Sequence, residues 1–192
     1  KAYVPVVGDK SHLVKLSLLN IKNYKLKEFN NLKNRFKITS QFRILNTLKQ
    51  DLSLLELPNH IECFDNSNFQ GSHPSSACVV FKNGKPLKSE YRHFNVKSVN
   101  KPDDFASMEE VVFRRYKRLI DEQKDLPQLI VIDGGKGQLS SALRSLKKLK
   151  LDKKIKCIGI AKRLEEIYFP FESTPIHINK KSESLKLIQK LR

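Results

Sequence analysis

The sequence LIVIDGGKG at residues 129–137 decides the fold, and the sequence IECFDNSN at residues 61–68 is its counterpart. Each is a short apolar run that ends in an aspartate, Asp133 in the first and Asp65 in the second. Side chains alternate faces along a strand, so Asp65 projects with Ile61 toward the expected core. A carboxylate at the end of a buried strand is costly unless a cation neutralises it. We therefore predict that the two aspartates form one acidic site.

The elements predicted around these aspartates are those of an α/β protein. Two more strand patterns follow the strand that ends at Asp65, and Asn83-Gly84 between them is a strong hairpin signal. A helix then opens with the capping-box sequence Ser107-Met108-Glu109-Glu110. The strand that ends at Asp133 leads through a helix into a parallel strand. In chain order, the predicted strands and helices cover residues 60–65, 77–81, 88–97, 107–120, 129–133, 139–149, 155–160, 176–178 and 182–192.

Three antiparallel strands, a helix and a parallel strand–helix–strand unit are the layout of the ribonuclease H-like mixed sheet flanked by helices. We predict this α/β fold for residues 59–192. In such a sheet the first and fourth strands are neighbours, which would place Asp65 beside Asp133. We expect the domain to be truncated, because the helix that begins at Ser182 stops in mid-pattern at Arg192.

Residues 1–58 are predicted to form a basic helical leader. Ser11 can cap a first helix, and Ser40 a second one whose leucine stripe ends at Pro58. The basic, asparagine-rich residues 20–37 between them are expected to be a partly solvated helix or a loop.

Carboxylates at adjacent strand ends are suited to divalent metal ions. Neighbouring strands lie about 4.8 Å apart, so Asp65 and Asp133 can share ions. Mg²⁺ and Mn²⁺ prefer oxygen ligands, and two such ions can activate water and stabilise the leaving oxygen of a phosphodiester. Asp104, at the start of the basic helix, is a candidate third catalytic acid. A helix cap is the alternative role for Asp104, since Asp is a preferred cap residue.

Positive charge dominates the composition. Lys and Arg number 37 against 20 Asp and Glu, a net charge of +17 that favours an acidic partner such as a phosphate backbone. A solvated lysine-rich surface is the alternative explanation. The predicted DNA contacts lie on the helix over 107–120, opposite its apolar stripe, and are Arg114, Arg115, Lys117 and Arg118.

The glycine-rich residues 134–137 lie between a strand and a helix, where backbone N–H groups and Lys136 can hold a phosphate. The glycine spacing is not that of a Walker motif, and a plain glycine turn is the alternative.

Three widely spaced cysteines, Cys63, Cys78 and Cys157, each lie among apolar residues. This is neither a disulfide framework nor a zinc pattern, so we interpret them as buried side chains in a reducing cytoplasm. The sequence has no signal-peptide pattern and no apolar run of membrane-spanning length. These features predict a cytoplasmic protein.

Five segments of the chain resemble one known family. They are residues 61–71, 101–108, 114–116, 132–139 and 159–162. The string DGGKGQL within them is highly specific. The segments are similar to the C-terminal endonuclease region of the UvrC family, the nuclease component of the bacterial UvrABC excinuclease, and the resemblance covers essentially the whole chain.

The resemblance implies a ribonuclease H-like nuclease that makes the 5′ incision beside a lesion in double-stranded DNA during nucleotide excision repair. The family's two strand-end catalytic aspartates fall on Asp65 and Asp133, and a further acid of its motif falls on Asp104. In this family the damage is handed over with UvrB, another component of the excinuclease. UvrB is therefore an expected partner, through segments that this chain does not contain.

Two departures from the family pattern shape the expected activity. Many relatives have His where this chain has Asn68, and the family's catalytic His follows the helix that ends here at Arg192. We therefore expect the isolated chain to bind DNA weakly and to cut it barely or not at all. The alternative function is that of a DNA- or protein-binding fragment of the same repair protein. A small phosphate-binding α/β enzyme that uses residues 134–137 is a third hypothesis, which requires another strand order.

Overall fold

The computed structural model describes residues 5–67, 75–96, 103–161 and 165–192. By its contacts the chain divides into two units, Lys1–Gln41 and Phe42–Arg192. The helix α1 (Asp9–Asp51) begins in the first unit and ends in the second. The asparagine-rich residues 20–37 are thus helical, and Ser40 lies inside the helix instead of opening a second one.

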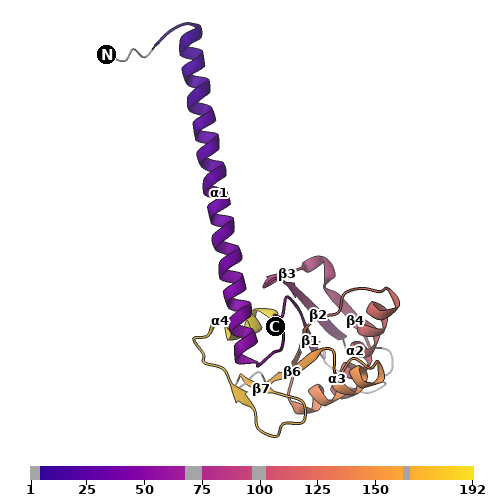
Figure 1. Cartoon of the computed structure of the whole chain (residues 1–192). Helices are drawn as coiled ribbons and strands as arrows, with labels where there is room; N and C mark the ends of the chain where they lie inside the picture. The colour runs from indigo at the N-terminus through magenta and orange to yellow at the C-terminus, as the bar shows by residue number, and fades with distance from the viewer. Residues whose placement is uncertain (1–4, 68–74, 97–102, 162–164) are drawn as a thin grey trace. The chain divides into compact units, whose positions relative to one another are not determined.

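The second unit is built on one sheet with helices on both faces (Figure 1). Its strands pair in the order β3-β2-β1-β5-β6-β7-β8, and β4 also pairs with β2. The strands are β1 (His60–Ser67), β2 (Ser75–Lys82), β3 (Lys85–Pro86), β4 (Arg92–Asn95), β5 (Leu129–Asp133), β6 (Lys156–Ala161), β7 (Glu166–Tyr168) and β8 (Ile176–His177). The helices are α2 (Asp104–Asp121), α3 (Lys136–Lys148) and α4 (Glu183–Leu191), with a short 3₁₀ turn at Lys88–Glu90.

This topology confirms the predicted ribonuclease H-like sheet. β1 and β2 are antiparallel, whereas β1, β5 and β6 are parallel neighbours. The hairpin at Asn83-Gly84 is also confirmed, because β2 pairs with β3 directly across it. Both turn residues have positive φ, 52° at Asn83 and 72° at Gly84, as a two-residue hairpin loop of type I′ requires.

Several predicted element boundaries differ from the structure. In the range 88–97, predicted as one strand, residues Lys88–Glu90 form the 3₁₀ turn and only β4 (Arg92–Asn95) is a strand; residue 97 lies outside the described part of the chain. The basic helix begins at Asp104 and not at the capping box. Its N-terminal cap is Asp103, whose carboxylate accepts from the backbone N–H groups of Phe105 and Ala106.

The alternation of side chains along the strands creates two apolar cores. One face of the sheet, with Phe64 and Ile132, packs against α2 and α3. The other face, with Ile61 and Val131, packs against α4 and the last turns of α1. Leu48 of α1 belongs to this second core, so residues 42–58, assigned to the leader from the sequence, are packed with the sheet.

Among the helices that the structure describes, none has the length and apolar character that crossing a bilayer requires.

A buried ion pair fastens α2 to the sheet. Glu62 on β1 is fully buried, and its carboxylate accepts two hydrogen bonds from the Arg115 guanidinium at 2.6 and 3.3 Å and one from the Tyr116 hydroxyl at 2.8 Å. Burial raises the pKa of Glu62, but the hydrogen bonds from His60, Arg115 and Tyr116 outweigh this effect, so the pKa is lowered. Arg115, only 6% exposed, is therefore a structural residue and not the predicted DNA contact.

We expect Arg115→Met to lower the free energy of unfolding by about 3–5 kcal/mol, because it leaves the buried Glu62 carboxylate without its charged partner. Arg114→Met is the matched control. Arg114 pairs with Glu110 on the helix surface, so its loss should cost at most about 1 kcal/mol. Urea unfolding of both variants checks this, and equal costs would contradict the assigned role of the buried pair.

Candidate functional site

Asp65 and Asp133 lie at the same end of neighbouring parallel strands. β1 and β5 are in register with Phe64 opposite Ile132, so the next residue on each strand is the aspartate. Because side chains alternate along each strand, both aspartates lie on the face of the sheet that α4 covers. The predicted adjacency of the first and fourth strands is thus confirmed, whereas the catalytic and metal-binding roles of the two aspartates stay predictions.

The two carboxylates line one open pocket of about 360 Å³ with Glu165, Gln189 and Arg192. Asp133 is almost fully buried, and the Arg192 guanidinium lies over it, with Nε 3.1 Å from Asp133 Oδ1. The same guanidinium has a second nitrogen 3.5 Å from Glu165 Oε1. Arg192 at the end of α4 therefore neutralises part of the negative charge of the pocket.

The donor set of this pocket fits a hard divalent cation. Asp65, Asp133 and Glu165 supply carboxylate oxygens and Gln189 an amide, which are ligand types that Mg²⁺ and Mn²⁺ accept. In the described residues, however, no three His, Cys, Asp or Glu side chains come close enough together to hold one ion. The pocket therefore suits a divalent cation by the types of its donor groups and by their position at the strand ends. The positively charged Arg192 guanidinium lies at this position.

Asp104 does not line the acidic pocket. It is the first residue of α2, and its backbone carbonyl accepts a hydrogen bond from the Asn66 side chain at 2.9 Å. Asn66 also accepts from the Ser76 hydroxyl. Asn66, next to Asp65, therefore ties the end of β1 to both β2 and the start of α2. Asn68, for which the family resemblance raised a question, lies outside the described residues.

The turn after Asp133 is closely packed. A Cβ at Gly137 would come within 2.3 Å of the Phe105 ring, so glycine lets the starts of α2 and α3 approach each other.

Lys136 does not line the acidic pocket. Its ammonium donates to the Ser173 carbonyl and lies 5.2 Å from the centre of the Tyr168 ring. Whether Lys136 contacts phosphate stays a prediction.

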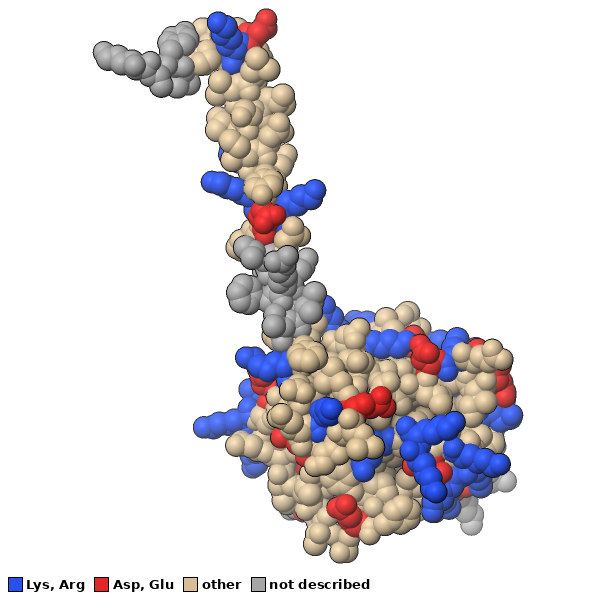
Figure 2. Space-filling view, in the orientation of Figure 1, with Lys and Arg blue, Asp and Glu red and all other residues tan. Residues whose placement is uncertain are grey.

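Three of the four predicted DNA contacts are exposed on α2. Arg114, Lys117 and Arg118 each form an ion pair with an acidic residue one turn along the helix. Lys and Arg side chains are spread over the visible face of the second unit, with fewer acidic side chains among them (Figure 2). Arg115 is the exception, because it is turned into the core toward Glu62.

Sequence reasoning missed Glu165, Gln189 and Arg192. A signal for Glu165 existed, since this acid follows a predicted buried strand by a few residues. No such signal marked Gln189 or Arg192, because these residues reach the pocket only through the packing of α4 on the sheet.

Comparison with known proteins supports this topology. A family model described as the UvrC RNAse H endonuclease domain matches residues 49–192. UvrABC system protein C of Flavobacterium johnsoniae is 56% identical over 192 residues, which are 100% of this chain and 32% of that protein. The counterpart in Porphyromonas gingivalis is 53% identical over 98% of this chain and 32% of its own length. The chain thus spans about a third of these curated relatives.

Solved structures give weaker likenesses. A crystal structure of Ciona intestinalis Endonuclease V, in complex with a 24mer DNA containing an inosine followed by a ribo-adenosine, matches with a TM-score of 0.43 and 18% identity. The match covers 88% of this chain and 67% of that one. The family is shown by the sequence matches alone: with a family model over residues 49–192 and relatives more than half identical along its length, this chain belongs to the UvrC RNase H endonuclease domain family.

Proposed function

We propose that this chain is the nuclease part of an excision-repair protein, which hydrolyses a phosphodiester on the 5′ side of a DNA lesion with the help of divalent metal ions. One observation carries the proposal: two carboxylates end adjacent parallel strands in one open pocket. Membership of the UvrC family supports DNA as the substrate. Damaged double-stranded DNA and the UvrB component of the excinuclease are the proposed partners, and the cytoplasm is the proposed location.

Asp65 and Asp133 would hold the metal, with Glu165 as a further oxygen ligand from the same pocket. A divalent ion held there would supply Lewis-acid chemistry, which would lower the pKa of a bound water and stabilise charge on the leaving oxygen. The chain itself fixes the two carboxylates, because β1 and β5 are held in register at the centre of the sheet. Asn66 keeps the end of β1 in place through its contacts to β2 and α2.

Metal binding should be stronger without Arg192, because its guanidinium competes for Asp133 and Glu165. We expect Arg192→Gln to tighten Mn²⁺ binding about fivefold, which corresponds to an ion pair of about 1 kcal/mol. Asp133→Asn should abolish binding. Isothermal titration calorimetry with Mn²⁺ measures both effects.

Arg43→Gln is the matched control for net charge, since Arg43 pairs with Glu183 and does not line the acidic pocket. It should leave the Mn²⁺ affinity unchanged. If Arg43→Gln and Arg192→Gln tightened binding equally, the effect would come from overall charge and the assigned site would be wrong.

Incision of damaged DNA should depend on both strand-end aspartates. In a protein of the full length of the relatives, supplied with UvrB, we expect Asp65→Asn or Asp133→Asn to reduce the 5′ incision rate by at least about 10²–10⁴-fold. Asp103→Asn is the control, because asparagine caps a helix as well as aspartate does. Asp104→Asn tests the predicted third acid. Gel analysis of a 5′-labelled duplex with one lesion gives the rates.

The isolated 192-residue chain provides the second arm of this experiment. We expect it to bind the same duplex while cutting it barely or not at all. Binding without incision in the long protein as well would favour the alternative, a DNA-binding fragment without nuclease activity. Efficient cleavage by the isolated chain would contradict the expected role of a residue beyond Arg192.

The exposed cations of α2 should contribute to DNA binding in a salt-dependent way. Exposed ion pairs are worth about 0.2–1 kcal/mol, so a DNA phosphate can replace the carboxylate partners of Arg114, Lys117 and Arg118 at little cost. Arg118→Ala should therefore reduce the slope of log affinity against log salt by about one. Arg115→Met, whose side chain is buried, should leave the slope unchanged. Fluorescence anisotropy at several salt concentrations checks this, and an unchanged slope for Arg118→Ala would place the DNA elsewhere.

A further inference from the structure

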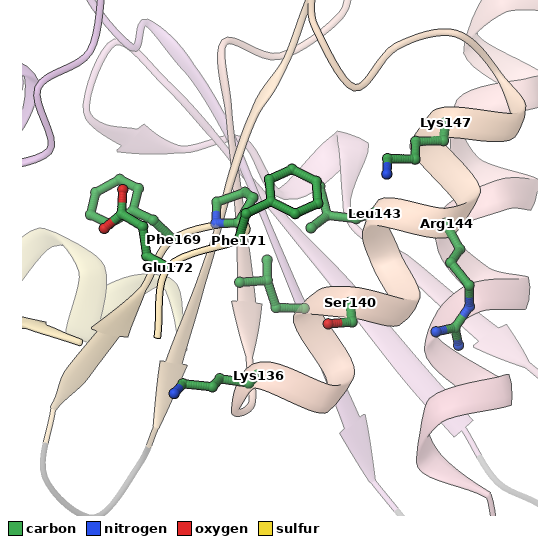
Figure 3. A pocket seen from close by; sticks show the side chains of 10 residues that line it. Lys136, Ser140, Leu143, Arg144, Lys147, Phe169, Phe171 and Glu172 are labelled. Carbon is green, nitrogen blue, oxygen red and sulfur yellow. The ribbon is translucent and has the colours of Figure 1, made fainter. Parts of the chain in front are cut away.

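A second pocket, of about 340 Å³, lies between α3 and the segment 169–172 that follows β7 (Figure 3). It shares no lining residue with the acidic pocket, although α3 is the helix that follows Asp133. The floor includes Leu143 of α3, and the rim carries Lys136, Arg144 and Lys147. The pocket therefore combines an apolar floor with a basic rim, and the proposed incision does not use it.

Phe171 is the most unusual residue of this pocket. Its side chain is 85% exposed, although it is a large aromatic group. Its φ of 66° lies in the left-handed region, which favours glycine and is unfavourable for a bulky side chain. Packing in the core does not explain why a phenylalanine occupies this position, and residues held in sparsely populated φ/ψ regions cluster at functional sites. An exposed aromatic ring held in this way is suited to stacking.

The charges around Phe171 favour an anionic ligand. The Lys147 ammonium lies 4.9 Å from the centre of the Phe171 ring. Figure 3 shows both side chains at this pocket. Within the described parts of the chain, neither Lys147 nor Lys136 forms an ion pair, whereas Arg144 pairs with Glu109. Glu172 is the acid of the lining. The positive charges of Lys136 and Lys147 are thus not neutralised by an acidic partner in the described residues, although the Lys136 ammonium donates to the Ser173 carbonyl.

We propose that this pocket binds a single-stranded segment of DNA, with one base stacked on Phe171 and neighbouring phosphates on Lys147 and Lys136. The proposal rests on the proposed action on DNA and adds a site that holds an unpaired strand. Lys136 and Lys147 are separated by about 16 Å along α3, a distance that spans a few nucleotides. A basic groove with an aromatic platform is the usual way in which proteins bind single strands without sequence preference. An apolar peptide would fill the floor but leave the basic rim without partners.

A tryptophan at position 171 provides a direct test, because the chain contains no other tryptophan. Oligo(dT) added to Phe171→Trp in the presence of a chelator should quench the fluorescence, since a stacked base contacts the indole. Blunt duplex DNA should not quench it. Phe42→Trp, at an exposed phenylalanine of α1, is the control and should show no quenching by oligo(dT). The chelator keeps this result independent of metal binding and of incision.

Substitutions at the same position separate binding from stability. Phe171→Gly should weaken oligo(dT) binding about tenfold through the loss of stacking. Its melting temperature should not fall, because glycine relieves the positive φ. Lys147→Gln should also weaken binding and reduce the salt slope by about one, whereas Lys153→Gln, on an exposed turn, should do neither.

Three results would overturn the proposal. Quenching that is equal at positions 171 and 42 would show non-specific association. Unchanged oligo(dT) affinity in Phe171→Gly would remove the stacking role. A fluorescence change with an apolar peptide, without any change on adding oligo(dT), would assign the pocket to a protein segment. The double variant Asp133→Asn/Phe171→Trp separates the two proposals. If oligo(dT) still quenches its fluorescence while Asp133→Asn has lost incision, the single-strand site works independently of the acidic pocket, as proposed.

Discussion

The parallel pairing of β1 with β5 is the constraint on which the rest of the structure depends. Two parallel neighbours cannot be joined by a hairpin, so the chain must leave β1, complete the antiparallel strands and return through α2 before β5 begins. β5 is buried along its whole length, which holds its register firmly. Because the strands are parallel, their carboxyl ends meet at one edge, and that edge carries Asp65 and Asp133.

The buried Glu62 carboxylate makes this arrangement specific. It lies on β1 but on the opposite face from Asp65, and it needs Arg115 and Tyr116 of α2 to satisfy it. An alternative placement of α2 would leave a buried charge without a partner. On one face of β1, Glu62 thus holds α2 against the sheet. On the other face, Asp65 lines the pocket under α4.

The two faces of the sheet also separate two kinds of chemistry. The face under α4 presents carboxylates with the Arg192 guanidinium above them. The helix α3, on the other face, presents lysines beside an exposed aromatic ring. Residues 133–136 join the two regions over a single tight turn. Asp133 of the acidic pocket and Lys136 of the second pocket are therefore only three positions apart in the chain.

The sequence by itself determined the features that depend on local period and turn chemistry. The apolar runs ending in Asp65 and Asp133, the Asn83-Gly84 hairpin and the alternation of strands and helices all follow from such local patterns, and together they predicted the fold. Only the tertiary structure decided which side chains are buried, which are exposed and which line the acidic pocket. Arg114 and Arg115 look alike in sequence, but a turn of about 100° between them puts one in water and the other on Glu62. Gln189 and Arg192 reach the acidic pocket through contacts between distant segments, and no local pattern encodes such contacts.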